Sequence, residues 1–400
     1  MLPLLCFLLQ TSGEQLYLGG KFEDARDQLS QEIRAGSATP QTYFWLAYTQ
    51  LALGDKPGAI LPFETYLKSN PNDEDVLYAL ARTYAQLAEI SLQQIFAIDP
   101  KCARAYQMRG IRHEIEKDWT KAIEQYRTAL KLDPGLRGVH ASIARIYEKE
   151  LGAPEQARIA RAREPRAAAP SAGIELVEKK QPREALPHLL QWRTARPGDS
   201  NVYYYLGEAY TDLKVAAVQR LRAANPESYR LHQIMAENYA SIHQNAEAAA
   251  EYRKVLAAQP TLPGAHYELG KLLTDSAPDE ACRMLEQELD IDPSHYLAKS
   301  LLGQLLAALH EQERAIPLLE EALAARPGLL DAHKALGRAL VESGKTESGL
   351  EQLRMVAKQS PEDEQIHFLL AQAYRALGQE EDAAREMRVN QETLRKLAVQ

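Results

Sequence analysis

The apolar residues of this chain recur every three or four positions, and the recurrence stops and restarts many times. In one representative stretch, Leu302 and Leu306 are four positions apart, and Ala315, Leu319 and Ala322 follow after a polar interval. Residues spaced in this way lie on one face of an α-helix, so the stretch predicts two amphipathic helices joined by a short turn. Runs of valine, isoleucine and threonine are scarce, which leaves little support for β-strands.

Prolines mark the ends of these helix pairs at a nearly constant interval. A proline cannot continue a helix interior but is well tolerated in the turn between pairs. Successive members of the series are 29 to 34 residues apart, and an interval of 34 occurs four times. The series consists of Pro71, Pro100, Pro134, Pro165, Pro197, Pro226, Pro260, Pro293, Pro327 and Pro361. The chain is therefore predicted to be a long array of helical hairpins.

The residues between the prolines resemble the tetratricopeptide repeat. Leu302-Gly303, Leu336-Gly337 and Leu370-Ala371 occupy equivalent places in three successive units. In that family, a small residue at this place lets the second helix approach the first, and large residues fill the remaining space. The resemblance covers roughly residues 13–392. It implies an all-α, right-handed α-solenoid of about 11–12 stacked helix-turn-helix hairpins.

A longer repeat lies above the short one. A constant offset of 126 residues relates Tyr84 to Tyr210 and His140 to His266, and it also relates three prolines of each half. Because 126 is not a multiple of 34, ordinary repeat similarity does not produce this register, and we infer a duplicated module. The predicted segments are 1–12, resembling a signal peptide; 13–165, an N-terminal repeat module; 166–293, its duplicate; and 294–400, regular repeats with a capping helix.

Each copy contains one unit shortened to 29 residues, and these two units lack an obvious turn. No glycine or proline interrupts residues 75–99 or residues 201–225, apart from Gly207 within the first helix. Two interpretations stay open: a very tight hairpin turn, or partial fusion of the two helices into one bent helix. Prolines and alanines crowd residues 163–173, which we interpret as the joint between modules. The arginines there are interpreted as a solvated helix end rather than an anion contact: Arg158, Arg161, Arg163 and Arg166.

The first twelve residues contain a short apolar run from Leu2 to Leu9, followed by small polar residues. The run resembles a clipped secretory signal peptide, although no lysine or arginine precedes it. It favours a periplasmic or secreted location over a cytoplasmic one; the alternative is a disordered or misassigned start of a cytoplasmic protein. The run is too short to span a bilayer, and no other segment is apolar enough to do so.

Composition and motifs argue against catalysis and nucleic-acid binding. The formal net charge of -8 repels phosphates on average. Cys6, Cys102 and Cys282 are far apart, and the sequence after His113-Glu114 lacks the second histidine of a zinc-protease motif. We therefore predict no enzyme activity, no metal, no cofactor and no small-molecule substrate. Five histidines at the fourth place of a first helix are predicted to pack: His140, His232, His266, His333 and His367.

The resemblance places the binding surface on the concave face, which the first helices of the hairpins line. Aromatic residues there offer a partner a large contact area at little entropic cost, and interspersed charges suit a peptide or a helix. The predicted partner-binding residues are Phe44, Tyr48, Tyr78, Arg82, Tyr204, Tyr267, Lys271, Lys334, Arg338 and Arg375. Phe368 and Gln372 occupy places of the same kind in the last hairpin.

The leading hypothesis is a non-enzymatic scaffold that binds a peptide or helix of another protein along the concave groove. The alternative is an obligate assembly or regulatory subunit of a larger envelope or secretion complex. Some members of the family bind chaperone tails through a clamp for two carboxylates, but here Arg338 stands where that clamp needs an asparagine after Lys334. The basic residues of the C-terminal groove could still attract an acidic segment.

Overall fold

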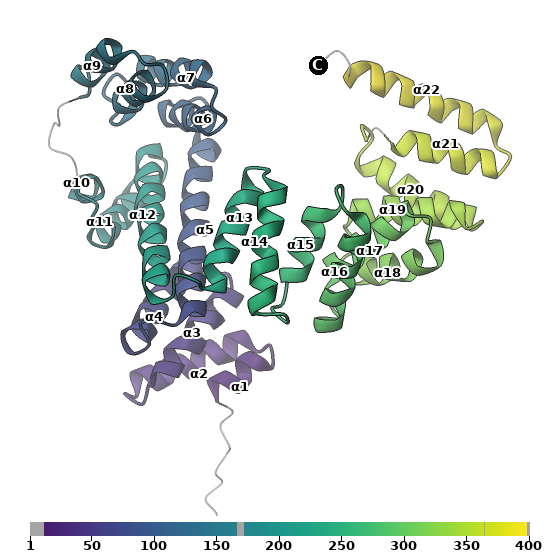
Figure 1. Cartoon of the computed structure of the whole chain (residues 1–400), viewed down its shortest axis with the longest axis horizontal. Coiled ribbons are helices and arrows are strands. Elements are labelled where there is room, and N and C mark those ends of the chain that lie inside the picture. Colours follow the sequence, from purple (N-terminus) through teal and green to yellow (C-terminus); the bar gives the residue numbers. More distant parts are fainter. Residues whose placement is uncertain (1–11, 166–171, 364, 398–400) are drawn as a thin grey trace, which may run out of the picture. The chain divides into compact units, whose positions relative to one another are not determined.

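The computed structural model describes residues 12–165, 172–363 and 365–397, in which every regular element is a helix. The segment 1–12, predicted to resemble a signal peptide, lies outside the described residues apart from Ser12. The described residues form 22 helices, most of them in sequential antiparallel pairs (Figure 1). This confirms the predicted all-α array of hairpins. No described helix combines the length and the apolar character that crossing a membrane requires.

The chain forms two compact units, divided after Ser228. This boundary falls inside the predicted duplicate of residues 166–293. The two compact units therefore do not coincide with the two copies of the duplicated sequence. The helices of the first unit are α1 Gly13–Leu18, α2 Phe22–Arg34, α3 Pro40–Ala52, α4 Lys56–Ser69, α5 Glu74–Ile98, α6 Ala103–Ile115, α7 Trp119–Leu132, α8 Val139–Lys149, α9 Pro154–Ala162, α10 Ala172–Glu178, α11 Pro182–Ala195 and α12 Ser200–Ala224.

The second unit is a regular succession of hairpins. Its helices are α13 Tyr229–Ser241, α14 Asn245–Ala258, α15 Ala265–Leu273, α16 Pro278–Ile291, α17 Tyr296–Ala308, α18 Gln312–Ala325, α19 Leu330–Glu342, α20 Thr346–Gln359, α21 Ile366–Ala376 and α22 Glu380–Leu397. The last helix includes most of the segment predicted to cap the array. Each hairpin pairs two helices that are consecutive in sequence.

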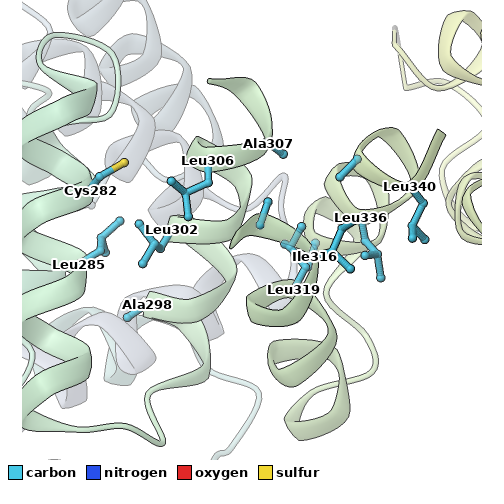
Figure 2. Close-up of a cluster of buried hydrophobic side chains, with 13 residues drawn as sticks. Cys282, Leu285, Ala298, Leu302, Leu306, Ala307, Ile316, Leu319, Leu336 and Leu340 are labelled. Atoms are coloured by element: carbon cyan, nitrogen blue, oxygen red, sulfur yellow. The ribbon is translucent and has the colours of Figure 1, made fainter. Parts of the chain in front are cut away.

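Close approach within a hairpin depends on the small residue that the sequence analysis identified. A Cβ atom on Gly303 would lie 2.6 Å from Cγ of Leu319, a distance that real Cβ atoms do not reach. The large residues then fill the space between neighbouring hairpins. Figure 2 shows one such cluster, in which Leu285, Leu302 and Leu336 come from α16, α17 and α19. Burying one leucine contributes roughly 2 kcal/mol, so each hairpin depends on its neighbours for much of its stability.

The two shortened units are continuous helices without a turn. α5 and α12 each run for 25 residues, which decides between the two alternatives in favour of fusion. The sequence explains this result, because neither helix contains a proline and their residues are mostly good helix formers. Asp73 and Asp199 cap their N-termini by accepting backbone hydrogen bonds. A fused unit cannot fold back on itself, so its two halves need another partner.

That partner is the equivalent helix of the other copy, because α5 and α12 pack side by side and antiparallel (Figure 1). At one end, Asn225 donates a hydrogen bond of 2.8 Å to Glu74. At the other end, Arg104, just beyond α5, donates one of 2.8 Å to Asn201. Midway along the pair, the rings of the equivalent residues Tyr84 and Tyr210 stack with their centroids 6.4 Å apart. An approximate twofold axis therefore relates α5 to α12.

Gly207 shows that the two shortened repeat units, which contain α5 and α12, have exchanged their second helices. In an ordinary hairpin the small residue faces a large residue 16 positions later, as Gly303 faces Leu319. In a unit five residues shorter, the partner of Gly207 would be Val218. A Cβ on Gly207 would instead lie 2.6 Å from Leu92, which is the residue equivalent to Val218 in the first copy. Each long helix thus supplies the first helix of one pair and the second helix of the other.

The offset of 126 residues recurs in the bounds of the helices. α11, α12, α13 and α14 begin and end 126 residues after α4, α5, α6 and α7 respectively. The loops before α8 and α15 also correspond, and each ends in a glycine with positive φ, Gly138 at 85° and Gly264 at 82°. α15 is two residues shorter than α8, and the turns that follow them are equally long, so from Pro154 and Pro278 onward the offset is 124.

Candidate partner-binding groove

A groove of about 510 Å³ runs across the first helices of three consecutive hairpins in the second unit. α17, α19 and α21 line it, in agreement with the place that the resemblance assigns to a binding surface. Its lining residues are Gln304, Ala307, Ala308, Asp331, Lys334, Ala335, Arg338, Glu342, Gln365, Phe368, Leu369 and Gln372. The groove thus contains two residues of the predicted site, Lys334 and Arg338.

Both cations of the groove are already paired with carboxylates. Nζ of Lys334 lies 2.8 Å from the carboxylate of Asp363, and Nε of Arg338 lies 2.7 Å from that of Glu342. Burial alone would raise the pKa of Asp363, but Lys334 and two backbone amides outweigh it and lower this pKa overall. Because these charges are balanced, the groove has no strong preference for an acidic segment.

Beside its polar residues, the groove contains an apolar strip. Ala307 and Ala308 from α17, Ala335 from α19, and Leu369 with Phe368 from α21 contribute to it. Phe368 is 41% exposed, a large fraction for a phenylalanine side chain. An exposed aromatic ring beside small residues leaves room for the side chains of a partner. The alanines were absent from the predicted site, because a search for large and charged residues does not find them.

The predicted site residues near the N-terminus belong to packed clusters. The ring of Phe44 lies 4.8 Å from that of Tyr48 and 5.3 Å from that of Tyr66, centroid to centroid. Tyr78 is only 6% exposed, and the guanidinium group of Arg82 lies over its ring. Phe44 and Tyr48 keep part of their surface exposed, whereas Tyr78 offers a partner very little.

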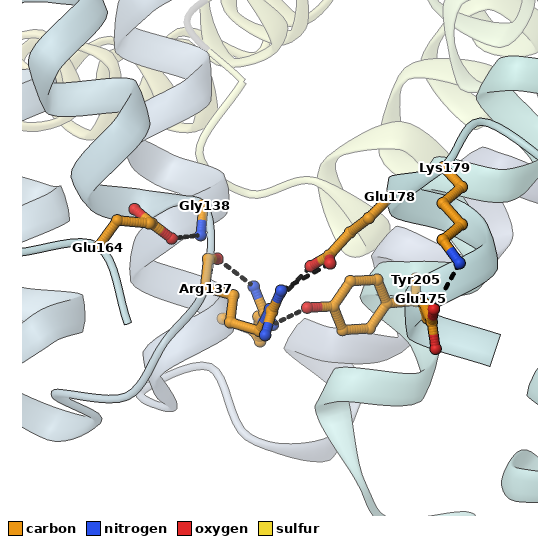
Figure 3. A network of polar contacts seen from close by, with 8 residues as sticks. Arg137, Gly138, Glu164, Glu175, Glu178, Lys179 and Tyr205 are labelled. Atoms are coloured by element: carbon orange, nitrogen blue, oxygen red, sulfur yellow. Dashed lines mark hydrogen bonds and ion pairs between the residues drawn. The ribbon is translucent and has the colours of Figure 1, made fainter. Parts of the chain in front are cut away.

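Tyr204 is part of an internal polar network that joins α6 to α12. The guanidinium group of the buried Arg104 lies 4.1 Å above its ring, and the side-chain amide of Gln107 donates a hydrogen bond to its hydroxyl. Burial raises the pKa of Tyr204 above its usual value. Figure 3 shows the adjoining contacts, in which Arg137 forms a bidentate pair with Glu178. Tyr204 therefore holds the first unit together at this point.

Tyr267, Lys271 and Arg375 lie in the second unit outside the lining of the groove. The ring of Tyr267 lies 4.9 Å from that of His295 and packs against the core of the neighbouring hairpin. Lys271 is exposed and lies 3.6 Å from Glu268, and Arg375 is exposed on α21. The structure thus brings together the predicted residues of α19 with Phe368 and Gln372, and leaves the others dispersed.

Two histidines at the fourth place of a first helix, His333 and His367, join the preceding proline turn to the hairpin. Nε2 of His333 donates to the carbonyl of Pro327, and Nε2 of His367 donates to that of Pro361. Nδ1 of His367 lies 2.7 Å from the carboxylate of Glu386. These contacts connect the proline turn, the first helix and the second helix of one unit. In the described ranges, no group of three or more His, Cys, Asp or Glu residues is arranged to hold a metal ion.

A second cleft, formed by α7, α8 and α9 in the first unit, was missed by the sequence analysis. It measures about 580 Å³, and Arg127, Lys131 and Arg163 contribute to its lining. The spacing of Arg127 and Lys131 by four residues on one helix was an available signal, since such residues share a face. The sequence alone did not reveal that the end of α9 adds a third cation to this face.

Matches to protein-family models agree with the repeat fold. Tetratricopeptide repeat models match residues 15–74, 103–136, 272–329 and 310–367. A crystal structure of MamA protein has 22% identity, covers 43% of this chain and 95% of its own, and gives a TM-score of 0.39. MamA 41-end from Desulfovibrio magneticus RS-1 has 21% identity, with 42% and 96% covered and a TM-score of 0.39.

A third structure is that of YrrB, which is described as a TPR protein with an unusual peptide-binding site. It has 21% identity, covers 44% of this chain and 91% of its own, and gives a TM-score of 0.40. At these TM-scores the likeness carries no conclusion about this chain.

Proposed function

Because the chain is a tetratricopeptide repeat protein, we propose that it is a non-enzymatic scaffold that holds a segment of another protein in the groove of α17, α19 and α21. The segment is an extended peptide or a single helix, since the groove crosses three parallel first helices and is open to solvent. A scaffold of this kind contributes binding and positioning, and the chemistry of any reaction belongs to its partners.

The observation that supports this proposal is the exposed ring of Phe368 beside the alanine strip. A partner side chain that covers the ring removes apolar surface from water, and the neighbouring alanines leave space for it to do so. The paired charges of Lys334 and Arg338 flank the strip and would fix the register of the segment through hydrogen bonds at the rim. We therefore expect Phe368 to be the main anchor.

The proposal is tested by comparing the Phe368→Ala and Met355→Ala variants. Met355 is 40% exposed and lies on the second helix α20, outside the groove, so it is matched to Phe368 in exposure and apolar character. Each full-length variant is purified from the source organism after crosslinking, and bound proteins are identified by mass spectrometry. The binding segment is then synthesised and titrated by calorimetry.

We expect Phe368→Ala to weaken binding by about 2 kcal/mol, close to thirtyfold, as for a central aromatic anchor. Met355→Ala should bind as the wild type does. A segment that binds equally to both variants and to the wild type would place the binding surface elsewhere and refute the assignment of the groove.

A further inference from the structure

The cleft between α7, α8 and α9 combines an apolar floor with a cationic rim. Ile143 and Ile159 contribute to the floor, and Arg127, Lys131 and Arg163 provide three positive charges. None of the residues that line the cleft is an aspartate or a glutamate. The cleft is built from two second helices and one first helix, so it differs in position and in charge from the groove of the second unit.

The three cations of the cleft form no ion pair within the part of the chain that the structure describes. Among the ion pairs of the described residues, none includes Arg127, Lys131 or Arg163, and Arg127 instead donates a hydrogen bond of 3.0 Å to the neutral hydroxyl of Tyr147. Glu164, which follows Arg163 in the sequence, is occupied elsewhere, because its carboxylate accepts hydrogen bonds from the backbone at the start of α8.

Two arginines on α9, close to Arg163, do have acidic partners. Arg158 pairs with Glu155 at 2.6 Å, and Arg161 pairs with Glu148. All three arginines are exposed, as the predicted solvated helix end requires, and Arg163 in addition lines the cleft. Arg166 lies outside the described residues. The positive charge of the segment is therefore concentrated in the cleft.

The second copy of the module provides an internal comparison, because its equivalent surface is neutralised. Arg253 corresponds to Arg127, and it pairs with Glu280 at 2.8 Å. Glu280 corresponds to Gln156, which lines the cleft of the first copy and has no charge. The residues equivalent to Lys131 and Arg163 are Ala257 and Gln287. One copy thus satisfies its arginine internally, and the other leaves a set of cations facing an open cleft.

We propose that the cleft of α7, α8 and α9 binds an acidic peptide segment of a partner protein, in which carboxylates alternate with aliphatic side chains. The carboxylates pair with Arg127, Lys131 and Arg163, and an aliphatic side chain covers the floor at Ile143 and Ile159. The apolar floor favours a peptide over the phosphates of a nucleic acid or a membrane, which would contact only the rim.

The experiment uses the full-length chain and a short peptide of alternating leucine and glutamate carrying an uncharged fluorophore. Binding is measured by fluorescence anisotropy at two salt concentrations. The decisive variant is Gln156→Glu, which gives Arg127 the partner that Arg253 already has. Gln156 is exposed, so the substitution leaves the core intact. A second variant, Lys131→Ala with Arg163→Gln, introduces the residues of the second copy, and Lys358→Gln is a control for charge on an exposed part of α20.

The expected result is saturable binding by the wild type that weakens with salt and falls about tenfold in Gln156→Glu, with a further loss in the second variant. Lys358→Gln should bind as the wild type does, and a peptide with glutamine in place of glutamate should not bind. Equal affinity of Gln156→Glu and Lys358→Gln would overturn the proposal. So would binding of anionic phosphatidylglycerol vesicles or single-stranded DNA through these cations when the peptide does not bind.

Discussion

The two copies of the duplicated module share their backbone but differ in how they use their charged residues. α6 and α7 in the first copy correspond residue for residue to α13 and α14 in the second. On this common frame, Arg127 faces an open cleft while Arg253 pairs with Glu280. A duplicated frame therefore does not imply a duplicated site, because a single change from amide to carboxylate decides whether an arginine is available to a partner.

The features that both copies retain are those that the fold needs. In each copy, a glutamate near the end of a second helix caps the loop that leads into the first helix of the same hairpin: Glu164 accepts a hydrogen bond from the amide of Gly138, and Glu288 accepts one from that of Gly264. Left-handed backbone at these glycines explains why no other residue type suits the position well. The capping positions thus correspond between the copies, whereas the residues that distinguish the cleft of the first copy lie on a surface open to solvent.

The largest effect is expected where the two copies meet, at the exchanged helices. Gly207→Leu forces a side chain into the space of Leu92 and should lower the free energy of unfolding of the first unit by about 3 kcal/mol. The equivalent position of the first copy is already an alanine, Ala81. Native-state hydrogen exchange of α5 and α12, followed by mass spectrometry, measures the loss within this unit.

A double-mutant comparison identifies the partner of Gly207. Adding Leu92→Ala should restore more than 1 kcal/mol of the loss, because it makes room for the new side chain. Adding Val218→Ala should restore nothing, since Val218 would be the partner only if α12 folded back as a hairpin. If Val218→Ala restores stability and Leu92→Ala does not, the two shortened repeat units have not exchanged their second helices.

The sequence predicts the repeated hairpins because each of them follows local rules. Gly303 and Leu319 lie at fixed places of one unit, and their contact could be predicted without knowledge of the remaining chain. The exchange of α5 and α12 is different, because it joins residues more than one hundred positions apart. The missing turns indicated fusion, but the pattern of either helix alone does not specify which helix covers its exposed face.

The candidate site was predicted only where exposure follows from the repeat register. Lys334 and Arg338 line the groove as expected, whereas Tyr78 has the same register but is buried. Its position in a fused helix explains the difference, since that helix packs against a partner that ordinary repeats lack. The cleft of α7, α8 and α9 was missed because Arg163 joins Arg127 and Lys131 only in three dimensions.

A smaller effect is expected from removing the glutamate caps, and it should differ between the copies. Glu288 is fully buried and accepts hydrogen bonds from the amides of Gly264 and Tyr267. Glu288→Ala leaves two donors without a partner and should cost about 2 kcal/mol. Glu164→Ala should cost about 1 kcal/mol or less, because water can reach the corresponding amides. Hydrogen exchange at the starts of α15 and α8 measures both, and equal losses would contradict the difference in burial.

The smallest expected effect is a dependence of stability on pH, and it should differ between the two copies. Burial alone would raise the pKa of Glu251, but hydrogen bonds from Lys254 and His232 lower it overall. In the first copy the equivalent residue is Gln125, whose side-chain oxygen accepts no hydrogen bond from the described residues. A lowered pKa in the folded state means that the ionised carboxylate adds stability above its unfolded-state pKa, and that this stability disappears as the pH falls through the folded-state pKa.

Calorimetric melting of Glu251→Gln and Gln125→Glu between neutral pH and the pH range of carboxylate titration tests this reasoning. Glu251→Gln should cost about 1 kcal/mol at neutral pH, and the cost should shrink as the pH falls, because the wild-type carboxylate then becomes protonated as well. Gln125→Glu should show the opposite trend. The first copy has Thr128 and Tyr106 where the second has Lys254 and His232, so the new carboxylate lacks a cation and destabilises the protein only while it is ionised. A cost of Glu251→Gln that is independent of pH would mean that the carboxylate stabilises α13 and α14 by packing rather than by its charge.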